Sequence, residues 1–78
     1  MSVDLDRTRP IWRQIVAIVQ DRIEDGTYPV GGKVPSVVEL STEFGVAAST
    51  AQKVLAFLKA EGWVRAEIGL GTFVEKRP

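Results

Sequence analysis

The stretch from residue 35 to residue 63 constrains this 78-residue chain most strongly, because it spells two helices joined by a tight turn. Ser36 and Glu39 have the three-residue spacing of a capping box, in which each side chain satisfies a backbone N–H of the other residue. Gly45 supplies the left-handed conformation that ends a helix at low cost. Beyond it, apolar residues recur at helical spacing: Ala51, Val54, Leu55 and Leu58. This pattern predicts a helix-turn-helix.

A further helix is predicted before this unit and a β-hairpin after it. Pro10 suits the first turn of a helix, and apolar residues follow it at helical spacing: Ile11, Ile15, Ile18, Val19 and Ile23. Residues 64–75 alternate apolar and charged side chains around a glycine-bearing turn, as a half-buried hairpin does. We expect the short piece Lys33-Val34 to be able to add a rung to this small sheet.

The predicted fold is mainly α with a small β-hairpin, a winged helix-turn-helix of three helices plus a wing. The predicted elements are helices at 10–25, 36–44 and 48–61 and a hairpin at 64–75. They make one domain over 10–75, between a flexible N-terminal arm, 1–9, and a tail, 76–78. The predicted core contains Ile15, Ile18, Leu40, Phe44, Val54, Leu55, Leu58 and Phe73.

The residue content excludes several kinds of chemistry. The chain has no cysteine and no histidine, which rules out disulfides, thiolate metal sites and histidine general-base catalysis. We therefore expect no enzyme, no metal and no cofactor. No apolar run approaches the length of a membrane span and no signal peptide is visible, so we expect a cytoplasmic protein without a membrane partner.

The net charge is zero, with ten basic and ten acidic residues, which is weak support for a nucleic-acid partner. The way the charges are distributed along the chain supports a nucleic-acid partner better than the net charge does. Residues 49–78 hold five basic and three acidic residues, so the positive excess lies in the half that contains the second helix of the unit.

The chain resembles the DNA-binding domain of the GntR family of bacterial transcription regulators. The resemblance rests on the order and spacing of short pieces: Pro10 to Ile15, Gly26 to Pro29, Gly31, Val34 to Ser36, Glu39-Leu40, Phe44 to Val46, Leu58 to Gly62 and Gly71 to Val74. It covers about residues 10–75. It implies a winged helix whose third helix enters the major groove of double-stranded DNA while the wing lies on the backbone.

This chain departs from the family pattern where the family usually contacts DNA. Val38, Ala48 and Gln52 stand where the pattern has arginines. The wing tip reads Ile68-Gly69-Leu70-Gly71 where the pattern has an arginine between two glycines. The scaffold positions match, whereas the usual contact positions do not.

The residues that the resemblance assigns to DNA are Ser36, Ser49, Thr50, Gln52, Lys53, Arg65, Gly69, Gly71 and Thr72. Gln52 can pair with adenine N6 and N7, and hydroxyls and lysine can bind phosphate or base edges. The alternative for Ser49 and Gln52 is a second capping box, since they have the required spacing. The alternative for Gly69 and Gly71 is a plain hairpin turn.

Other charged and aromatic residues also have two interpretations. Lys33, Arg65, Lys76 and Arg77 can contact phosphates, or be ordinary solvated surface charges. Arg7 and Arg9 can follow the minor groove, but we favour the alternative, a disordered charged terminus. For Trp12, Trp63 and Phe73 we expect core packing rather than base stacking.

Two functions follow. The first is a sequence-specific transcriptional regulator, a repressor, that forms at most a weak homodimer or dimerises on DNA. The second is a winged-helix module that binds a protein through an exposed apolar patch around Val38, Ala48, Ile68 and Leu70, with Val37 and Ala47 beside it. The alternative for the patch is that Val38 or Ile68 turns inward and that the rest of these residues are scattered.

Overall fold

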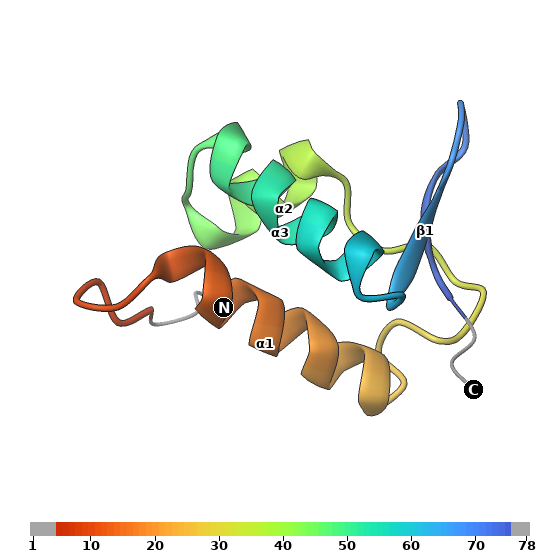
Figure 1. The fold of residues 1–78 in the computed structure, drawn as a ribbon, viewed down its shortest axis with the longest axis horizontal. Helices are drawn as coiled ribbons and strands as arrows, with labels where there is room; N and C mark the ends of the chain where they lie inside the picture. The colour runs from red at the N-terminus through yellow and green to blue at the C-terminus, as the bar shows by residue number, and fades with distance from the viewer. Residues whose placement is uncertain (1–4, 76–78) are drawn as a thin grey trace.

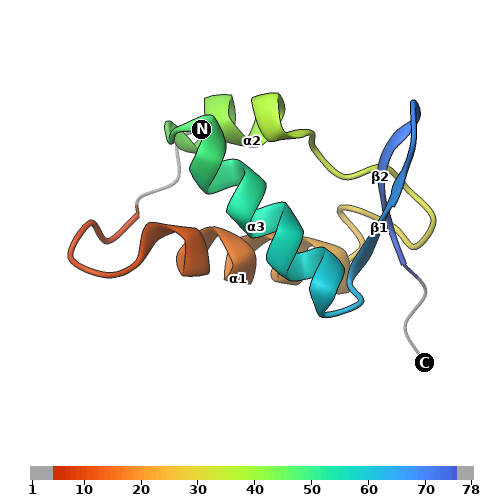
Figure 2. The ribbon, with the colours of Figure 1, turned by 45° about the horizontal axis from the view of Figure 1, so that its top comes forward.

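In the computed structural model, which describes residues 5–75, three helices pack together and a two-stranded antiparallel hairpin lies beside the end of the third helix (Figure 1). The elements are α1 (Ile11–Glu24), α2 (Val37–Phe44), α3 (Ala48–Ala60), β1 (Val64–Glu67) and β2 (Gly71–Val74). Helix α3 crosses between α1 and α2 (Figure 2). The predicted winged helix-turn-helix is thus confirmed, with each helix boundary within a residue or two of its predicted position. The tail 76–78 and residues 1–4 of the arm lie outside the described residues.

The turn between α2 and α3 forms as its residues predict. The Ser36 Oγ accepts the Glu39 backbone N–H at 3.2 Å, and a Glu39 carboxylate oxygen accepts the Ser36 N–H at 2.9 Å. Gly45 caps the other end of α2 in the left-handed region, with φ 63°. The chain then turns directly into α3, so that α2 and α3 pack as a helix-turn-helix.

Helix α1 begins slightly later than predicted. Pro10 is its N-cap, with extended backbone angles, instead of lying within the first turn. Ahead of it, the Gln14 side-chain amide accepts the Asp6 N–H at 2.8 Å and donates to the Asp6 carbonyl at 2.7 Å. These two bonds hold residues 5–9, part of the expected arm, against the start of α1.

The core lies where the three helices and the base of the hairpin meet. Its buried residues are Ile15, Val16, Val19, Val34, Leu40, Phe44, Ala51, Val54, Leu58, Val64 and Val74. Five of the eight predicted core residues are among them. Ile18 and Leu55 are half-buried and pack against this core, whereas Phe73 lies outside it. None of the described helices is long and apolar enough to cross a membrane.

The prediction that Phe73 lies in the core was wrong. Side chains alternate between the two faces of β2, and the face that carries Val74 is the one turned toward the core. Val64 pairs with Val74 and Arg65 pairs with Phe73, so Val74 and Phe73 lie on opposite faces of the hairpin. The Arg65 guanidinium carbon lies 5.9 Å from the centre of the Phe73 ring, on the outer face. Val74 is therefore the core residue of β2.

The segment before α2 adds a rung to the sheet, as expected for Lys33-Val34. Lys33 forms an antiparallel bridge with Phe73, and the Val34 N–H donates to the Thr72 carbonyl at 2.8 Å. Gly31 and Gly32 form two further backbone bonds with Val74. Strand β2 is consequently hydrogen-bonded along both edges.

Candidate nucleic-acid interface

Helix α3 presents one long side to solvent. Its exposed residues are Ala48, Ser49, Gln52, Lys53, Ala56, Lys59 and Ala60, opposite the buried residues Ala51, Val54 and Leu58. Small side chains dominate this side, so a long polar side chain such as Gln52 can reach past them. A surface of this shape suits a helix that enters the major groove, which is about 12 Å wide.

A shallow groove separates this side of α3 from the wing. Its volume is about 260 Å³, and it is lined by Val37, Gln52, Leu55, Ala56, Lys59, Ala66 and Thr72. Of the predicted contact residues, it brings Gln52 and Thr72 together. Ala56 and Lys59 were missed by the sequence reasoning, although their spacing from Gln52 along a helix places them on the same side.

The second capping box, which was the alternative interpretation of Ser49 and Gln52, does not form. Helix α3 begins after Ala47, whose side chain cannot cap, and no side-chain cap bond is present. Neither Ser49 nor Gln52 has a side-chain hydrogen bond within the described part of the chain. Both side chains are thus exposed and available for an external partner. Thr50, by contrast, is half-buried.

Ser36 is exposed at the N-terminus of α2, close to the groove through its neighbour Val37. Its Oγ accepts the cap bond from Glu39, while its hydroxyl hydrogen remains free to donate. The capping bonds hold the pKa of Glu39 below its ordinary value, and the largest cause is the hydrogen bond that the Ser36 backbone N–H donates to its carboxylate. Glu39 therefore stays ionised beside the predicted contact residue.

Arg65 is engaged within the wing. Its Nε lies 2.9 Å from a Glu67 carboxylate oxygen, and its Nη1 lies 3.5 Å from Glu75. The bond to Glu67 is the main cause of a raised pKa for Arg65. One arginine is thus shared between two carboxylates, so the described wing, residues 64–75, carries a net negative charge. The predicted contact by Arg65 would require these ion pairs to open.

The wing tip is apolar and fully exposed. Ile68 has a relative exposure of 102% and Leu70 of 67%, and Gly69 lies between them in the turn. Val38 on α2 is 71% exposed, so the alternative in which Val38 or Ile68 turns inward is wrong. Gly71 follows in β2 with φ 125°, where an added Cβ would lie 2.6 Å from the Lys33 Cε.

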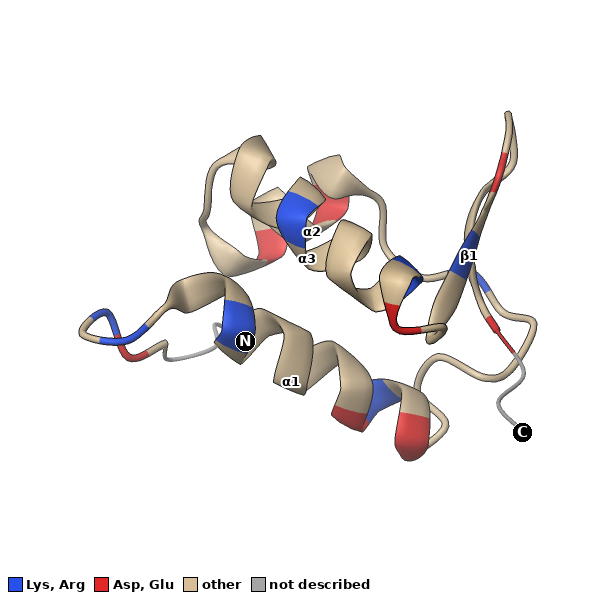
Figure 3. Cartoon of the chain, viewed as in Figure 1, with Lys and Arg blue, Asp and Glu red and all other residues tan. Residues whose placement is uncertain are grey.

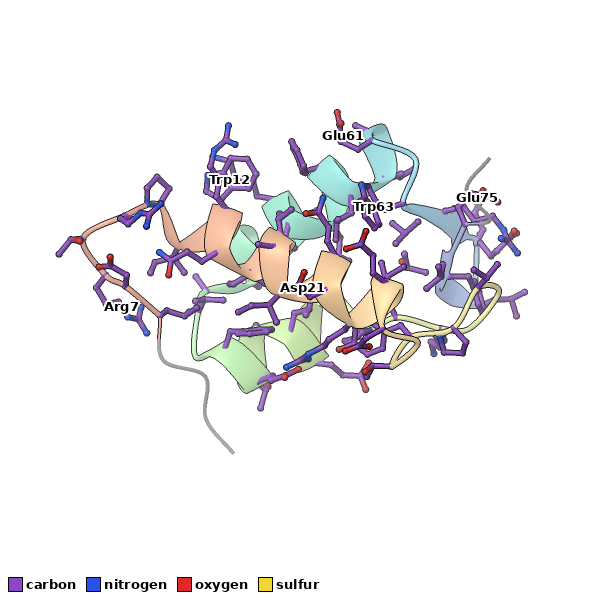
Figure 4. The ribbon with its side chains drawn as sticks, turned by 90° about the horizontal axis from the view of Figure 1, so that it is seen from below. Arg7, Trp12, Asp21, Glu61, Trp63 and Glu75 are labelled. Carbon is purple, nitrogen blue, oxygen red and sulfur yellow. The ribbon has the colours of Figure 1, made fainter. Side chains whose placement is uncertain are left out.

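Lys53 has a partner that the sequence did not predict. Its Nζ lies 4.6 Å from the centre of the Trp12 ring, and the Arg13 guanidinium carbon lies 4.9 Å from the same centre. Trp12 itself packs edge-on against Phe57, with ring centroids 5.5 Å apart. Trp12 and Trp63 pack against the core, as expected, and lie far apart along the domain (Figure 4). Lys76 and Arg77 lie outside the described residues.

Together, the helix-turn-helix, the exposed side of α3 and the adjoining hairpin define a winged helix-turn-helix of the DNA-binding kind. The sequence model described as "Bacterial regulatory proteins, gntR family" matches residues 12–74, and the chain belongs to this family. This is a family of regulatory proteins, consistent with the expectation that the chain is not an enzyme.

Several known proteins resemble the chain in sequence and in fold. An uncharacterised HTH-type transcriptional regulator of Rhizobium meliloti is 42% identical over 67 residues, which cover 86% of this chain and 28% of that protein. A GntR family transcriptional regulator from Listeria monocytogenes matches with a TM-score of 0.89 and 33% identity, over 94% of this chain and 64% of that chain. The DNA-binding domain of AraR, solved in complex with operator ORE1, matches with a TM-score of 0.77 and 30% identity, over 81% of this chain and 77% of that one. The chain thus spans less than a third of the length of the Rhizobium relative.

Proposed function

We propose that this domain binds the operator DNA of a bacterial transcriptional regulator. The regulator is cytoplasmic and represses transcription by occupying its operator. Helix α3 lies in the major groove, and Gln52 reads a base there. The observation that carries this proposal is the exposed side of α3, on which Gln52 projects into the groove beside the wing without an internal partner among the described residues. A free amide can match the donor and acceptor on the adenine edge.

The remaining contacts position the domain. Ser36, Ser49 and Thr72 offer hydroxyl groups at the rim of α3 and the wing, and Thr50 contributes less because it is half-buried. Gly69 and Gly71 let the wing backbone approach the duplex closely. The backbone N–H groups at the start of α3 add a phosphate contact, since they lie at the positive end of the helix dipole.

One domain of this size makes few base contacts, so we propose that two copies bind a palindrome. The half-sites lie about one helical turn, roughly 34 Å, apart or a multiple of that distance. We expect the isolated domain to dimerise weakly in solution and to pair on the operator. Sedimentation of the free domain at low micromolar concentration measures this, and a tight dimer without DNA would contradict it.

The test is selection of a site from random duplexes, followed by binding measurements on variants. Gln52→Ala should lower affinity for the selected site by ~1–3 kcal/mol, about 5- to 150-fold, and relax the preference at one base pair. Gln52→Arg should shift that preference toward guanine. Because Gln52 is exposed, both variants should melt like the wild type.

The exposed apolar residues favour a second candidate, a protein-binding module that uses the surface of Val38, Ala48, Ile68 and Leu70. Val38, Ile68 and Leu70 are exposed large apolar residues, and such residues often mark protein contacts where they gather on one face. Leu70→Asp or Ala48→Asp would then abolish binding to a co-purifying protein, while Gln52→Ala would leave every duplex affinity unchanged. That pair of results would replace the operator-binding proposal.

A further inference from the structure

The basic residues of this domain differ in whether a carboxylate already engages them. Arg22 is paired with Glu43, and Arg65 with Glu67 and Glu75. Arg13 and Lys53 have no carboxylate within ion-pair distance in the described part of the chain. A cation without a carboxylate partner can neutralise an external anion.

Arg13 and Lys53 lie together although they are far apart in the sequence. Arg13 is in the first turn of α1 and Lys53 in the second turn of α3, and both lie over the ring of Trp12, at 4.9 and 4.6 Å from its centre. The edge-on contact of Trp12 with Phe57 fixes the ring. A fixed ring holds both charged groups in place, which lowers the entropy cost when they bind a ligand.

The surface beside Arg13 is also basic. A hollow of about 240 Å³ is lined by Arg9, Pro10, Arg13, Gln14 and Ala17, with no acidic residue among them. The described acidic residues of α1 lie toward its opposite end, near the hairpin (Figure 3). The start of α1 and the adjoining part of α3 therefore form a basic edge, defined here as Arg9, Arg13 and Lys53 around Trp12.

This basic edge borders one long side of α3, and the wing borders the other. Gln52, Ala56 and Lys59 line the groove beside the wing, whereas Lys53 points toward α1. A helix in the major groove is flanked by the phosphates of both strands. The two borders thus face different strands. On one border, Arg13 and Lys53 have no carboxylate partner among the described residues. On the other, the arginine of the described hairpin is held by carboxylates, and the cations left there are Lys33, which lies against Gly71, and Lys59 in the groove.

We infer that the basic edge is a phosphodiester-binding site, and that it anchors the DNA strand on the α1 side of α3. Arg13 and Lys53 bind the backbone phosphates there, with Arg9 at the rim. The described wing, whose arginine is shared by two glutamates, contributes little phosphate neutralisation. This inference rests on the proposed placement of α3 in the major groove.

The test measures affinity for the selected duplex and for an unrelated duplex as a function of salt. Arg13→Gln should weaken binding to both duplexes by the same factor. It should make the slope of log affinity against log salt shallower by about 0.9 for each phosphate that Arg13 neutralises in the wild type. Arg13→Lys should keep most of the slope, because it keeps the charge. Val30→Glu, at an exposed loop position, makes the same net charge change and should leave the slope close to that of the wild type.

Three results would overturn the inference. If Arg13→Gln keeps the wild-type slope while Gln52→Ala alters base preference, the basic edge does not bind phosphate and the proposed function stands. If Arg13→Gln and Val30→Glu change the slope equally, the effect is one of net charge and not of a site. If the wild type binds no duplex but binds polyglutamate through Arg13, both proposals fail, and the edge recognises an acidic protein.

Discussion

Arg22 joins three parts of the domain, and replacing it tests whether this junction stabilises the fold. Its Nη2 lies 2.7 Å from the Glu43 carboxylate of α2, and its Nη1 donates to the Tyr28 hydroxyl at 2.8 Å. The guanidinium carbon lies 5.6 Å from the centre of the Phe44 ring. These hydrogen bonds raise the pKa of Arg22, and the bond to Glu43 is the largest cause. Arg22 therefore stays charged at every pH of interest.

The expected cost follows from the exposure of the pair. A hydrogen bond to a charged group stabilises a fold by about 1.5–3 kcal/mol when shielded, and a fully exposed ion pair by roughly 0–1 kcal/mol. The side chains of Arg22 and Glu43 are 24% and 33% exposed, between these limits. We expect Arg22→Met, which keeps the stem, to cost about 1–2.5 kcal/mol. In a domain of this size that lowers Tm by roughly 5–15 °C.

The assay is thermal and urea unfolding of the wild type, Arg22→Met, Glu43→Gln and the double variant. The matched control is Arg65→Met, whose ion pairs lie on the hairpin with its side chain 43% exposed, and which should leave Tm unchanged within error. Equal destabilisation by Arg22→Met and Arg65→Met would refute the reasoning. So would a double variant whose cost is the full sum of the two single costs, because that would mean no coupling between Arg22 and Glu43.

Three further predictions concern stability. Because the pKa of Glu39 is lowered in the folded state, its bond to Ser36 stabilises the fold above about pH 4.5, and this stabilisation is lost as pH falls through the lowered pKa. Thermal unfolding between about pH 2 and 7 should therefore show a smaller decrease of Tm at acid pH for Glu39→Gln than for the wild type. Gly71→Ala should cost ~1–3 kcal/mol because of its positive φ, and Lys33→Ala should restore little of it, since the Lys33 stem can move away; urea unfolding of both variants decides this. Leu40→Ala removes a fully buried side chain and should cost ~2–5 kcal/mol, seen as loss of helical circular dichroism on mild heating.

The helices could be predicted from sequence because their signals are local. The Ser36–Glu39 capping box and the left-handed Gly45 act within one helical turn, so no distant contact can change them easily. Apolar periodicity then indicated the inward side of each helix. Val34 could not be predicted as a core residue, because a single apolar residue in a loop has no period, and its burial depends on pairing with β2.

Spacing alone could not decide where several structures satisfy it. Ser49 and Gln52 fit a capping box, but α3 begins earlier, with Ala47 as its N-cap, so Ser49 already lies within the helix. In a four-residue strand, Phe73 and Val74 are both apolar, and only the pairing decides which one faces the core. The prediction chose Phe73 because it lies in an apolar stretch, and Val74 beside it satisfies that criterion equally.

The candidate site was predicted only in part, since charge pairing depends on tertiary structure. The resemblance assigned both Gln52 and Thr72 to DNA, and the structure places them in one groove. The sharing of Arg65 by two glutamates and the position of Lys53 over Trp12 arise from the hairpin register and from the crossing of α1 and α3. The sequence singled out Lys53 and Arg9 separately as possible DNA contacts, but it gave no sign that Arg13 and Lys53 meet over Trp12.

The bonding of β2 along both edges makes the wing a stiff extension of the helical body. Because β2 is hydrogen-bonded to β1 on one edge and to the segment around Val34 on the other, the wing cannot tilt without breaking several backbone hydrogen bonds at once. The amide hydrogens of Val34 and Val74 should therefore exchange slowly and together. A duplex that meets this domain must then adapt its own curvature to a rigid template. Easily bent pyrimidine–purine steps would be favoured near the wing, at base pairs that no side chain touches.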